Sequence, residues 1–188
     1  MSPDSKRRPR SDASRNRARL VAAAREALAE AGNDVAFDVI AQRAGVGNAT
    51  LYRHFPTRAD LLVAVYADEV AALCRHGEQL LESAEPTSAL FAWLDEFVVH
   101  VATKRALALA ATEDTGERHT MLFRDWHASI TSIADRLVRR AQPTLRSDLT
   151  ATDVLTLASG AALSADAARA RRLVALLRSG IAASTSTD

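Results

Sequence analysis

The chain of 188 residues can hold a small module and a larger helical bundle, and its 48% hydrophobic and 25% charged residues are typical of a globular protein. No apolar run approaches the roughly 20 residues that span a bilayer, and no signal-like segment follows the basic start, so we expect a cytoplasmic protein outside the membrane. The single cysteine, Cys74, excludes an internal disulfide and a cysteine-based metal site. Residues 1–60 carry 11 Lys or Arg against 7 Asp or Glu, which makes this end the expected nucleic-acid-binding end.

Residues 1–14 form a polar N-terminal segment. They contain two prolines, several serines and the basic cluster Lys6, Arg7, Arg8 and Arg10. Because almost nothing in the segment is apolar, we expect a disordered arm. Such an arm is either a solvated tail or a DNA contact that follows phosphates or enters a minor groove.

Residues 15–60 have the pattern of a three-helix DNA-binding domain. Apolar residues recur at helical spacing from residue 15 to residue 31, and two shorter helices are expected near 38–44 and 48–54. Helices joined by a turn as short as 45–47 cross steeply, so the contact needs small side chains and the turn needs backbone freedom. Ala41, Ala44 and Gly45 meet these needs, and the pattern predicts a helix-turn-helix.

Residues 61–183 are predicted to form a second, larger bundle, followed by a frayed tail at 184–188. Its first helix starts slightly earlier, with a capping box of Thr57 and Asp60, and is expected to end near Ser83. Further helices are expected at 86–104, 117–141, about 150–165 and 168–181, with a short apolar segment at 106–111. No segment alternates apolar and polar residues between hairpin turns, so the predicted fold class is all-α.

The stretch from Ile40 to Arg58, IAQRAGVGNATLYRHFPTR, resembles the signature of the TetR family of transcriptional regulators. The resemblance covers residues 15 to about 66, and beyond them it is architectural. It implies a repressor whose third helix enters the major groove of a double-stranded DNA operator. The positions that it places at or near the DNA are Arg43, Gly47, Asn48, Ala49, Thr50, Tyr52, Arg53, His54 and Arg58.

The chemistry of these positions suits DNA. Asn48 can pair with adenine and Arg53 with guanine, whereas Thr50, Tyr52 and His54 suit phosphate oxygens. At the start of the fourth helix, Arg58 is expected to meet phosphate. Tyr52 has an alternative role, in which its ring packs on the first helix.

The second helix departs from the family pattern at its start. The family often has Thr or Ser there, which caps the helix and donates to a phosphate, whereas this chain has Ala36. Asp38 is the alternative cap. One phosphate contact is then missing or comes from another residue, because a carboxylate near DNA is electrostatically unfavourable.

The resemblance further implies an unknown small-molecule effector inside the C-terminal bundle. Its helices offer aromatic and polar side chains for a pocket, although most of these are expected to be ordinary core. His100 and Trp126 are favoured, since each brings a polar atom that a buried site must satisfy. No ligand class follows, and no cofactor or metal is expected. The pocket positions are Phe91, Trp93, Phe97, His100, Phe123, Trp126 and His127.

The last two helices are expected to form a homodimer interface. The helix that starts at Thr150 is rich in alanine, so another helix can approach it closely, and the final helix is rich in leucine. Together they resemble the four-helix dimer interface of the family, which presents two half-sites to a palindromic operator. The alternative is that the same small face packs within the chain.

Two other functions compete with an effector-released repressor. One is a DNA-binding regulator without an effector, which acts constitutively or as an activator. The other is an enzyme or metal-binding protein. The spacing of its candidate ligands is poor, because His119 and His127 lie eight residues apart, and no catalytic motif is present. The side chains that this alternative would use are Glu113, Asp114, Glu117, His119, Asp125 and His127.

Overall fold

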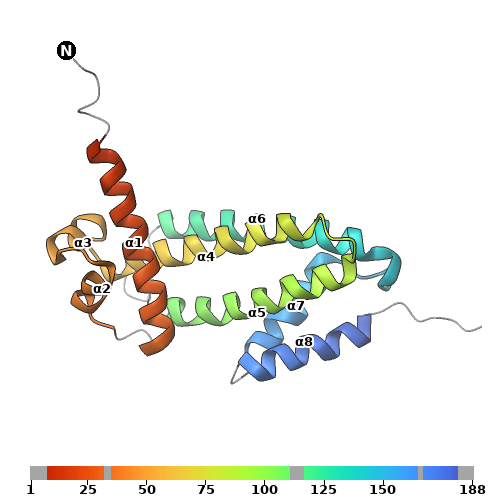
Figure 1. Ribbon diagram of the computed structural model, residues 1–188. Helices are drawn as coiled ribbons and strands as arrows, with labels where there is room; N and C mark the ends of the chain where they lie inside the picture. The colour runs from red at the N-terminus through yellow and green to blue at the C-terminus, as the bar shows by residue number, and fades with distance from the viewer. Residues whose placement is uncertain (1–7, 32–34, 111–116, 165–166, 182–188) are drawn as a thin grey trace, which may run out of the picture. The chain divides into compact units, whose positions relative to one another are not determined.

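The computed structural model describes residues 8–31, 35–110, 117–164 and 167–181, and it contains helices and no β-strand in these ranges (Figure 1). The predicted all-α fold class is confirmed. The chain divides into two compact units, unit 1 (Met1–Asp68 with Leu109–Asp114) and unit 2 (Glu69–Ala108 with Thr115–Asp188). The helices are α1 (Arg8–Ala31), α2 (Phe37–Ala44), α3 (Asn48–His54), α4 (Arg58–Leu80), α5 (Pro86–Ala110), α6 (Glu117–Ala141), the short η3 (Gln142–Thr144), α7 (Ala151–Ala162) and α8 (Ala167–Ile181).

Unit 1 is built on α1, α2, α3 and the start of α4. Its core is a continuous apolar cluster in which Leu20 of α1 and Leu51 of α3 have no exposed surface. Ala41 and Ala44 are buried on α2, as the steep crossing of two short helices requires. Since Leu61 of α4 completes the cluster and α4 continues past Asp68, this helix contributes to both units.

Helix α1 starts earlier than the sequence predicts. Residues 8–14 were expected in a disordered arm, but the helix begins at Arg8. Local contacts account for this, because Arg15 donates to the carboxylate of Asp12 one turn away and Pro9 lies in the first turn, where its missing N–H has no helical partner to lose. The remaining residues of the arm, 1–7, lie outside the described ranges, as do 184–188.

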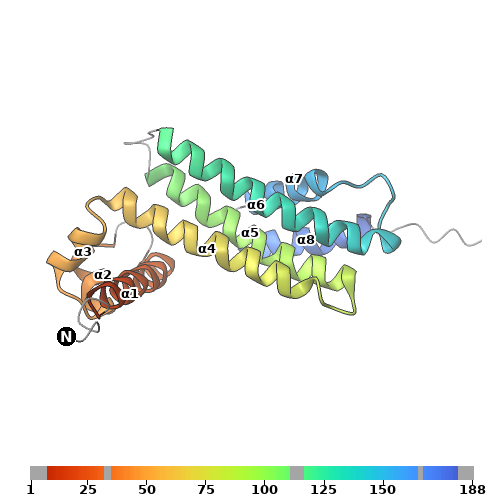
Figure 2. The same ribbon diagram turned by 90° about the horizontal axis from the view of Figure 1, so that it is seen from above.

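Unit 2 packs α5 and α6 along the second part of α4, with α7 and α8 against them (Figures 1 and 2). α4, α5 and α6 approach one another closely at Gly77. A Cβ atom there would lie 2.3 Å from Cγ2 of Ile133 and 2.9 Å from Nε1 of Trp93. Trp93 is completely buried and donates to the carbonyl of Leu73 over 3.1 Å, so the bundle depends on the missing side chain.

Three helix ends differ from expectation, one of them that of α4 at Leu80 rather than near Ser83, and two helix starts agree with it. α5 continues to Ala110 through the break predicted near Lys104, because no Gly or Pro interrupts it there, and α7 ends at Ala162. Both predicted capping boxes are present. Asp153 Oδ2 accepts the N–H of Thr150 over 3.0 Å at α7, and Asp60 Oδ2 accepts that of Thr57 over 3.0 Å at α4.

Candidate nucleic-acid interface

The turn between α2 and α3 depends on Gly45. Its φ of 64° and ψ of 40° lie in the left-handed region, which costs other residues about 1–2 kcal/mol. The N–H of Gly45 points to the carbonyls of Ala41 and Gln42, and that of Val46 donates to Ala41 over 3.0 Å. These bonds satisfy the last carbonyls of α2 and redirect the chain into α3.

Helix α3 is held in place by two buried side chains. Leu51 is its one buried residue, and Phe55, which follows the helix, is 2% exposed and donates its N–H to Leu51 over 2.8 Å. The N-cap is Gly47, whose carbonyl accepts the N–H of Thr50 over 2.9 Å. Because so short a helix is unstable alone in water, the core of unit 1 fixes its orientation.

The predicted DNA contacts on α3 share one outward surface. Tyr52 is 54% exposed, and its ring lies 5.5 Å from that of Phe37 on α2, so the contact found for this ring is with the second helix. The surface presents the guanidinium of Arg53 among amide, hydroxyl and imidazole groups, a mixture suited to bases and phosphates. Its exposed residues are Gly47, Asn48, Ala49, Tyr52 and Arg53, with Thr50 and His54 half-buried.

Two predicted contacts are not on this surface, because the chain itself binds their guanidinium groups. Arg43 forms an ion pair with Glu30 of α1 at 2.8 Å, and this hydrogen bond lowers the pKa of the Glu30 carboxyl. Arg58 is half-buried and donates from Nη1 to the carbonyl of Val35 over 2.7 Å. The first bond connects α2 to α1, and the second connects the start of α4 to the segment that precedes α2.

The start of α2 lacks a side-chain cap. Ala36 is the N-cap residue and has no side chain that could accept a hydrogen bond from the helix. Asp38 lies inside the first turn and accepts the N–H of Val39 over 2.8 Å. Its carboxylate therefore satisfies one free N–H and interacts favourably with the helix dipole, although it does not replace the missing cap.

Two arginines of α1 bind the helix-turn-helix through contacts that the sequence did not predict. The guanidinium of Arg17 lies over the ring of Phe55, 5.3 Å from its centroid. Arg19 Nη2 donates to the carbonyl of Gly45 over 3.5 Å. Neither partner is near in sequence, and one is a backbone atom, so no local pattern could have indicated these contacts.

In unit 2, three of the predicted pocket residues form a column on α5. Trp93 stacks on Phe97 with centroids 5.6 Å apart, and the ring of His100 follows at 6.5 Å. His100 is 6% exposed, and its Nδ1 lies 4.0 Å from the carboxylate of Glu69 on α4, a residue that the sequence did not single out. At one end of the column the indole of Trp93 donates a hydrogen bond to Leu73. At the other end the buried imidazole of His100 lies beside the carboxylate of Glu69.

The other predicted pocket residues lie elsewhere. Phe91 is buried beneath the guanidinium of Arg178 from α8, which is 5.4 Å from the ring centroid. On α6, Phe123 and Trp126 are half-buried and pack edge to face at 5.3 Å. His127 is exposed and its Nδ1 lies 2.6 Å from the carbonyl of Phe123.

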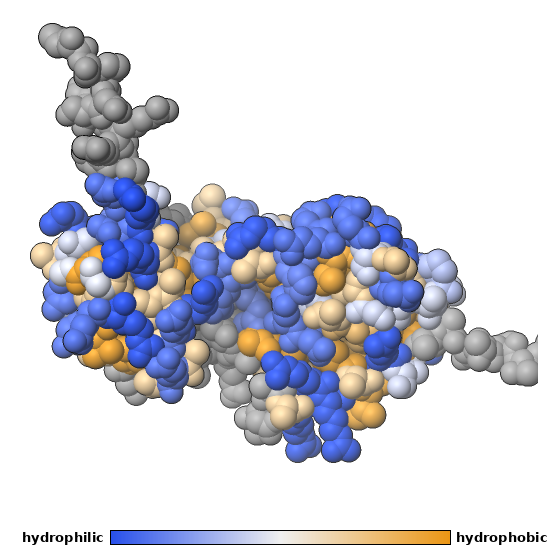
Figure 3. All heavy atoms as spheres, in the orientation of Figure 1, coloured by the Kyte–Doolittle hydropathy of each residue, from blue (hydrophilic) through white to orange (hydrophobic). Residues whose placement is uncertain are grey.

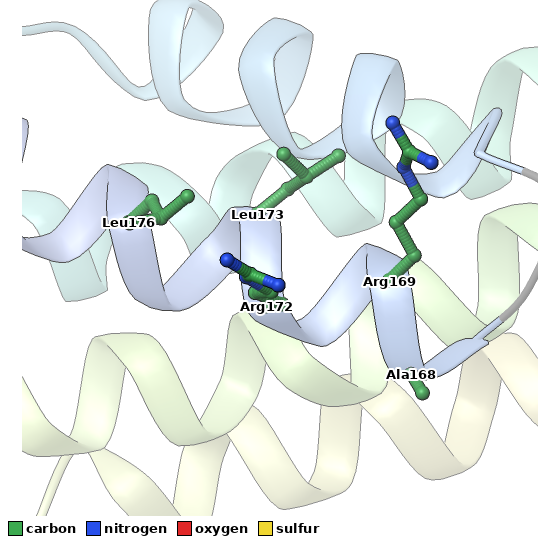
Figure 4. Close-up of a pocket in the computed structure, with 5 residues that line it drawn as sticks. All are labelled: Ala168, Arg169, Arg172, Leu173 and Leu176. Carbon is green, nitrogen blue, oxygen red and sulfur yellow. The ribbon is translucent and has the colours of Figure 1, made fainter.

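Helices α7 and α8 combine a packed inner face with exposed leucines. The alanines of α7, such as Ala158 and Ala161, are buried within the chain, as the alternative to a dimer interface predicted. Outward, Leu157 is 49% and Leu176 is 60% exposed. Figure 4 shows a hollow along α8 in which Arg169 and Leu173 rise from the same side. Its lining includes Ala168, Arg169, Arg172, Leu173 and Leu176.

The residues weighed for a metal or catalytic site remain scattered where they are described. Asp125 and His127 are exposed on α6, and Glu113 and Asp114 lie outside the described ranges, as do the side chains of Glu117 and His119. Within the described part of the chain, no three His, Cys, Asp or Glu side chains are grouped to hold a metal ion. Among the same residues, no helix is long and apolar enough to cross a membrane.

Comparisons with known proteins agree with the helix-turn-helix and extend past it. Residues 20–65 match the family described as bacterial regulatory proteins, tetR family, and residues 85–183 match the C-terminal domain of SbtR-like transcriptional regulators. No curated protein sequence matches.

Solved structures are similar over nearly the whole chain. The TetR transcriptional regulator SCO0520 of Streptomyces coelicolor is 34% identical, with 90% of this chain and 99% of that chain covered and a TM-score of 0.75. A TetR transcription regulatory protein of Mycobacterium vanbaalenii is 31% identical, with 93% and 99% covered and a TM-score of 0.73. The SmeT–triclosan complex shares the fold, at 15% identity, 90% and 93% coverage and a TM-score of 0.59. The chain belongs to the TetR family and is a DNA-binding transcriptional regulator rather than an enzyme.

Proposed function

We propose that the protein is a cytoplasmic repressor that binds a palindromic operator as a homodimer and leaves it when a small molecule binds unit 2. One observation carries the DNA-binding part: α3 is anchored through Leu51 and turns a row of polar side chains outward. In this role Asn48 and Arg53 read bases, and Thr50, Tyr52 and His54 bind phosphate. Arg43 and Arg58 have protein partners and are secondary at most.

The homodimer proposal rests on the outward side of α7 and α8. These two helices pack against each other, and both carry exposed leucines, Leu157 on α7 and Leu173 and Leu176 on α8, which a monomer would leave in water. A second copy would cover them, and two copies would present two α3 helices to the two half-sites of a palindrome.

Sedimentation equilibrium tests the homodimer directly. Leu173→Asp with Leu176→Asp should produce a folded monomer, because each substitution places a charge where the partner would pack. Met121→Asp is the matched control, since Met121 is 57% exposed on α6. A wild-type monomer that binds a complete palindrome with full affinity would contradict this part of the proposal.

The effector proposal rests on the column of Trp93, Phe97 and His100. A buried imidazole beside a carboxylate is costly to leave in an apolar bundle, and such groups commonly orient a ligand. α4 supplies Glu69 to this region and Leu61 to the core of unit 1, so it is the element through which binding would act on α3. The complex of SmeT with triclosan is a precedent in a protein of the same fold.

The operator is the first object to test. Fluorescence polarisation with DNA from upstream of the gene should give binding at least about a thousandfold tighter than to random duplex. Arg53→Ala with Tyr52→Ala should remove this preference, and Arg124→Ala, an exposed arginine of α6, should keep it. Equal affinity for operator and random duplex would refute sequence-specific binding.

Effectors can then be sought by mass spectrometry of molecules that copurify. A true effector should raise the Tm and weaken operator binding, and His100→Ala should abolish both responses while the exposed His127→Ala keeps them. If no copurified molecule changes operator binding, the alternative of a constitutive regulator without an effector is favoured.

A further inference from the structure

We propose that the hollow along α8 is a binding site for an amphiphilic anion, a small molecule with a negatively charged group and an apolar body. Arg172 binds the charged group, and Leu173 and Leu176 contact the apolar body. The inference rests on the proposed homodimer, because these leucines belong to the surface that a second copy would cover. It is carried by the shape of the hollow, by the positions of the arginines of α8 and by the small number of acids on the last two helices.

The hollow lies on a side of α8 that the packing of unit 2 does not use. The packed side carries Ala170, Val174 and Ile181, which are buried at helical spacing. On the other side, Leu173 is 38% and Leu176 is 60% exposed, and both line the hollow. Its volume of about 610 Å³ is within the roughly 300–1,000 Å³ of small-molecule sites. A small molecule therefore has both room and apolar surface here.

Cationic and apolar side chains meet at this hollow. Figure 4 shows Arg172 between Leu173 and Leu176 on one side and Arg169 on the other, and Figure 3 shows hydrophilic residues beside hydrophobic ones along the lower edge where Figure 1 places α8. An inorganic ion would leave the leucines in water, and a purely apolar molecule would leave the guanidinium without an acceptor. A molecule that is both anionic and apolar satisfies both kinds of group.

The arginines of α8 differ in their surroundings. Arg178 donates to the hydroxyl of Ser88 on α5 over 3.2 Å. Partial burial raises the pKa of the Asp95 carboxyl on α5, and the nearby charge of Arg171 counteracts this rise. Arg172 lines the hollow instead, and within the described part of the chain no hydrogen bond or ion pair is found for it. Arg172 is therefore the guanidinium that can bind an anion without giving up a partner in the described structure.

The last two helices contain few acids that could neutralise these arginines across a homodimer. α7 has one acid, Asp153, and α8 has four arginines and no acid. The carboxylate of Asp153 already accepts hydrogen bonds from Thr150 in the helix cap. In a two-fold dimer the same surface of both copies meets, so α8 brings like charges together. A bound anion supplies the missing negative charge, and we expect it to strengthen the homodimer.

Three probes separate the charge of the ligand from its apolar body. Octanoate carries both, inorganic phosphate carries only the charge, and octyl glucoside carries the same apolar chain without a charge. Isothermal titration calorimetry on the full chain should show saturable binding of octanoate. Phosphate and octyl glucoside should each bind about tenfold more weakly or worse, because each leaves one part of the hollow unused.

Variants of α8 assign the binding to the hollow. Arg172→Gln keeps a helix-forming residue and should lower the affinity for octanoate about tenfold. Leu176→Ala should weaken octanoate binding and leave phosphate binding unchanged. Arg171→Gln is the matched control, since it removes the same charge from the same helix outside the hollow, and it should bind octanoate like the wild type. Circular dichroism must show unchanged helix content in each variant.

Sedimentation equilibrium then measures the effect on the homodimer. Octanoate should tighten the wild-type dimer severalfold, because it neutralises a cation in each copy. Arg172→Gln should tighten the dimer without any ligand and should remove the response to octanoate. Arg171→Gln should keep that response.

The outcomes separate this inference from the proposed homodimer. If Arg172→Gln weakens the dimer and octanoate does not affect it, the arginine pairs with an acid of the second copy, so the inference is refuted and the homodimer stands. If octanoate and octyl glucoside bind alike and Arg172→Gln changes neither, the hollow only adsorbs apolar molecules and the inference is again refuted. If the chain stays monomeric with and without octanoate, the homodimer fails, and the calorimetry alone decides whether the hollow binds the anion.

Discussion

The two units place their functional candidates in opposite environments. In unit 1 the side chains proposed to bind DNA are exposed on a short helix, and a different set of residues, with Leu51 foremost, holds that helix. In unit 2 the column from Trp93 to His100 is buried and is part of the packing itself. Substitutions of the exposed residues of α3 should therefore change DNA binding with little effect on stability. Substitutions in the column of unit 2 should affect stability together with any ligand binding.

The sharpest test of this contrast pairs Trp93 with Tyr52. Trp93→Ala should lower the free energy of unfolding by about 3–5 kcal/mol, because it removes a completely buried side chain from unit 2 together with the indole hydrogen bond to Leu73. Tyr52→Ala should cost less than about 1 kcal/mol, since only the contact with Phe37 is lost, yet it should weaken operator binding. Denaturant unfolding at one fixed protein concentration measures both.

The contrast would break if the two variants were equally stable, or if Tyr52→Ala bound the operator normally. The second result would leave Tyr52 with the ring contact to Phe37 as its main role.

Gly77 probes the same interior with a smaller change. Alanine normally stabilises a helix relative to glycine by about 1 kcal/mol. At Gly77 its Cβ would collide with Ile133 and Trp93, so Gly77→Ala should instead destabilise the protein by about 1–3 kcal/mol. Gly180→Ala on α8, where a Cβ meets nothing within 4 Å, is the control and should be neutral or slightly stabilising. A stabilised Gly77→Ala protein would mean that the three helices separate easily.

Substitution of Arg58 tests whether this half-buried side chain of unit 1 stabilises the fold or contacts DNA phosphate. Because its guanidinium donates to Val35, Arg58→Gln should lower the free energy of unfolding by about 1–2 kcal/mol. The salt dependence of operator binding should stay unchanged. The opposite pattern, with normal stability and a salt slope smaller by about one, would establish Arg58 as a phosphate contact.

Thr150 gives the smallest effect, at the edge of unit 2. Its hydrogen bonds to Asp153 lower the pKa of that carboxyl, so the cap stabilises the protein above the ordinary pKa and is lost as the pH falls through the lowered one. Thr150→Ala should reduce the Tm by about 2–4 °C near neutral pH. The deficit should shrink in acid.

The matched variant for this cap is Thr152→Ala, at an exposed position of the same helix, and it should not change the pH profile. A deficit for Thr150→Ala that stays constant down to strongly acidic pH would show that Asp153 does not contribute to the cap.

The features that sequence could predict are those written in local patterns. Helical spacing, Gly45 in the turn and the two capping boxes gave the helices of unit 1 and the starts of α4 and α7. The early start of α1 was missed because short-range pairs such as Arg15 with Asp12 add helix stability without any apolar periodicity.

Contacts between segments that are distant in the sequence could not be predicted from it. Arg58 donates to a backbone carbonyl and Arg43 pairs with Glu30, so two side chains that were expected at the DNA also have partners within unit 1. Glu69 was overlooked beside His100 because an acidic residue on a long helix is usually solvated, and only packing reveals that this one is not.

Gly45 has a consequence for genetics. It has no side chain with which to bind DNA, yet its left-handed backbone sets the direction in which α3 leaves the turn. A selection for cells that have lost regulation by this protein should therefore recover substitutions of Gly45 alongside those of Arg53. A screen for soluble protein in the same library should deplete the Gly45 substitutions and retain the Arg53 substitutions. Comparing the two results would separate residues that hold α3 in place from residues that contact DNA.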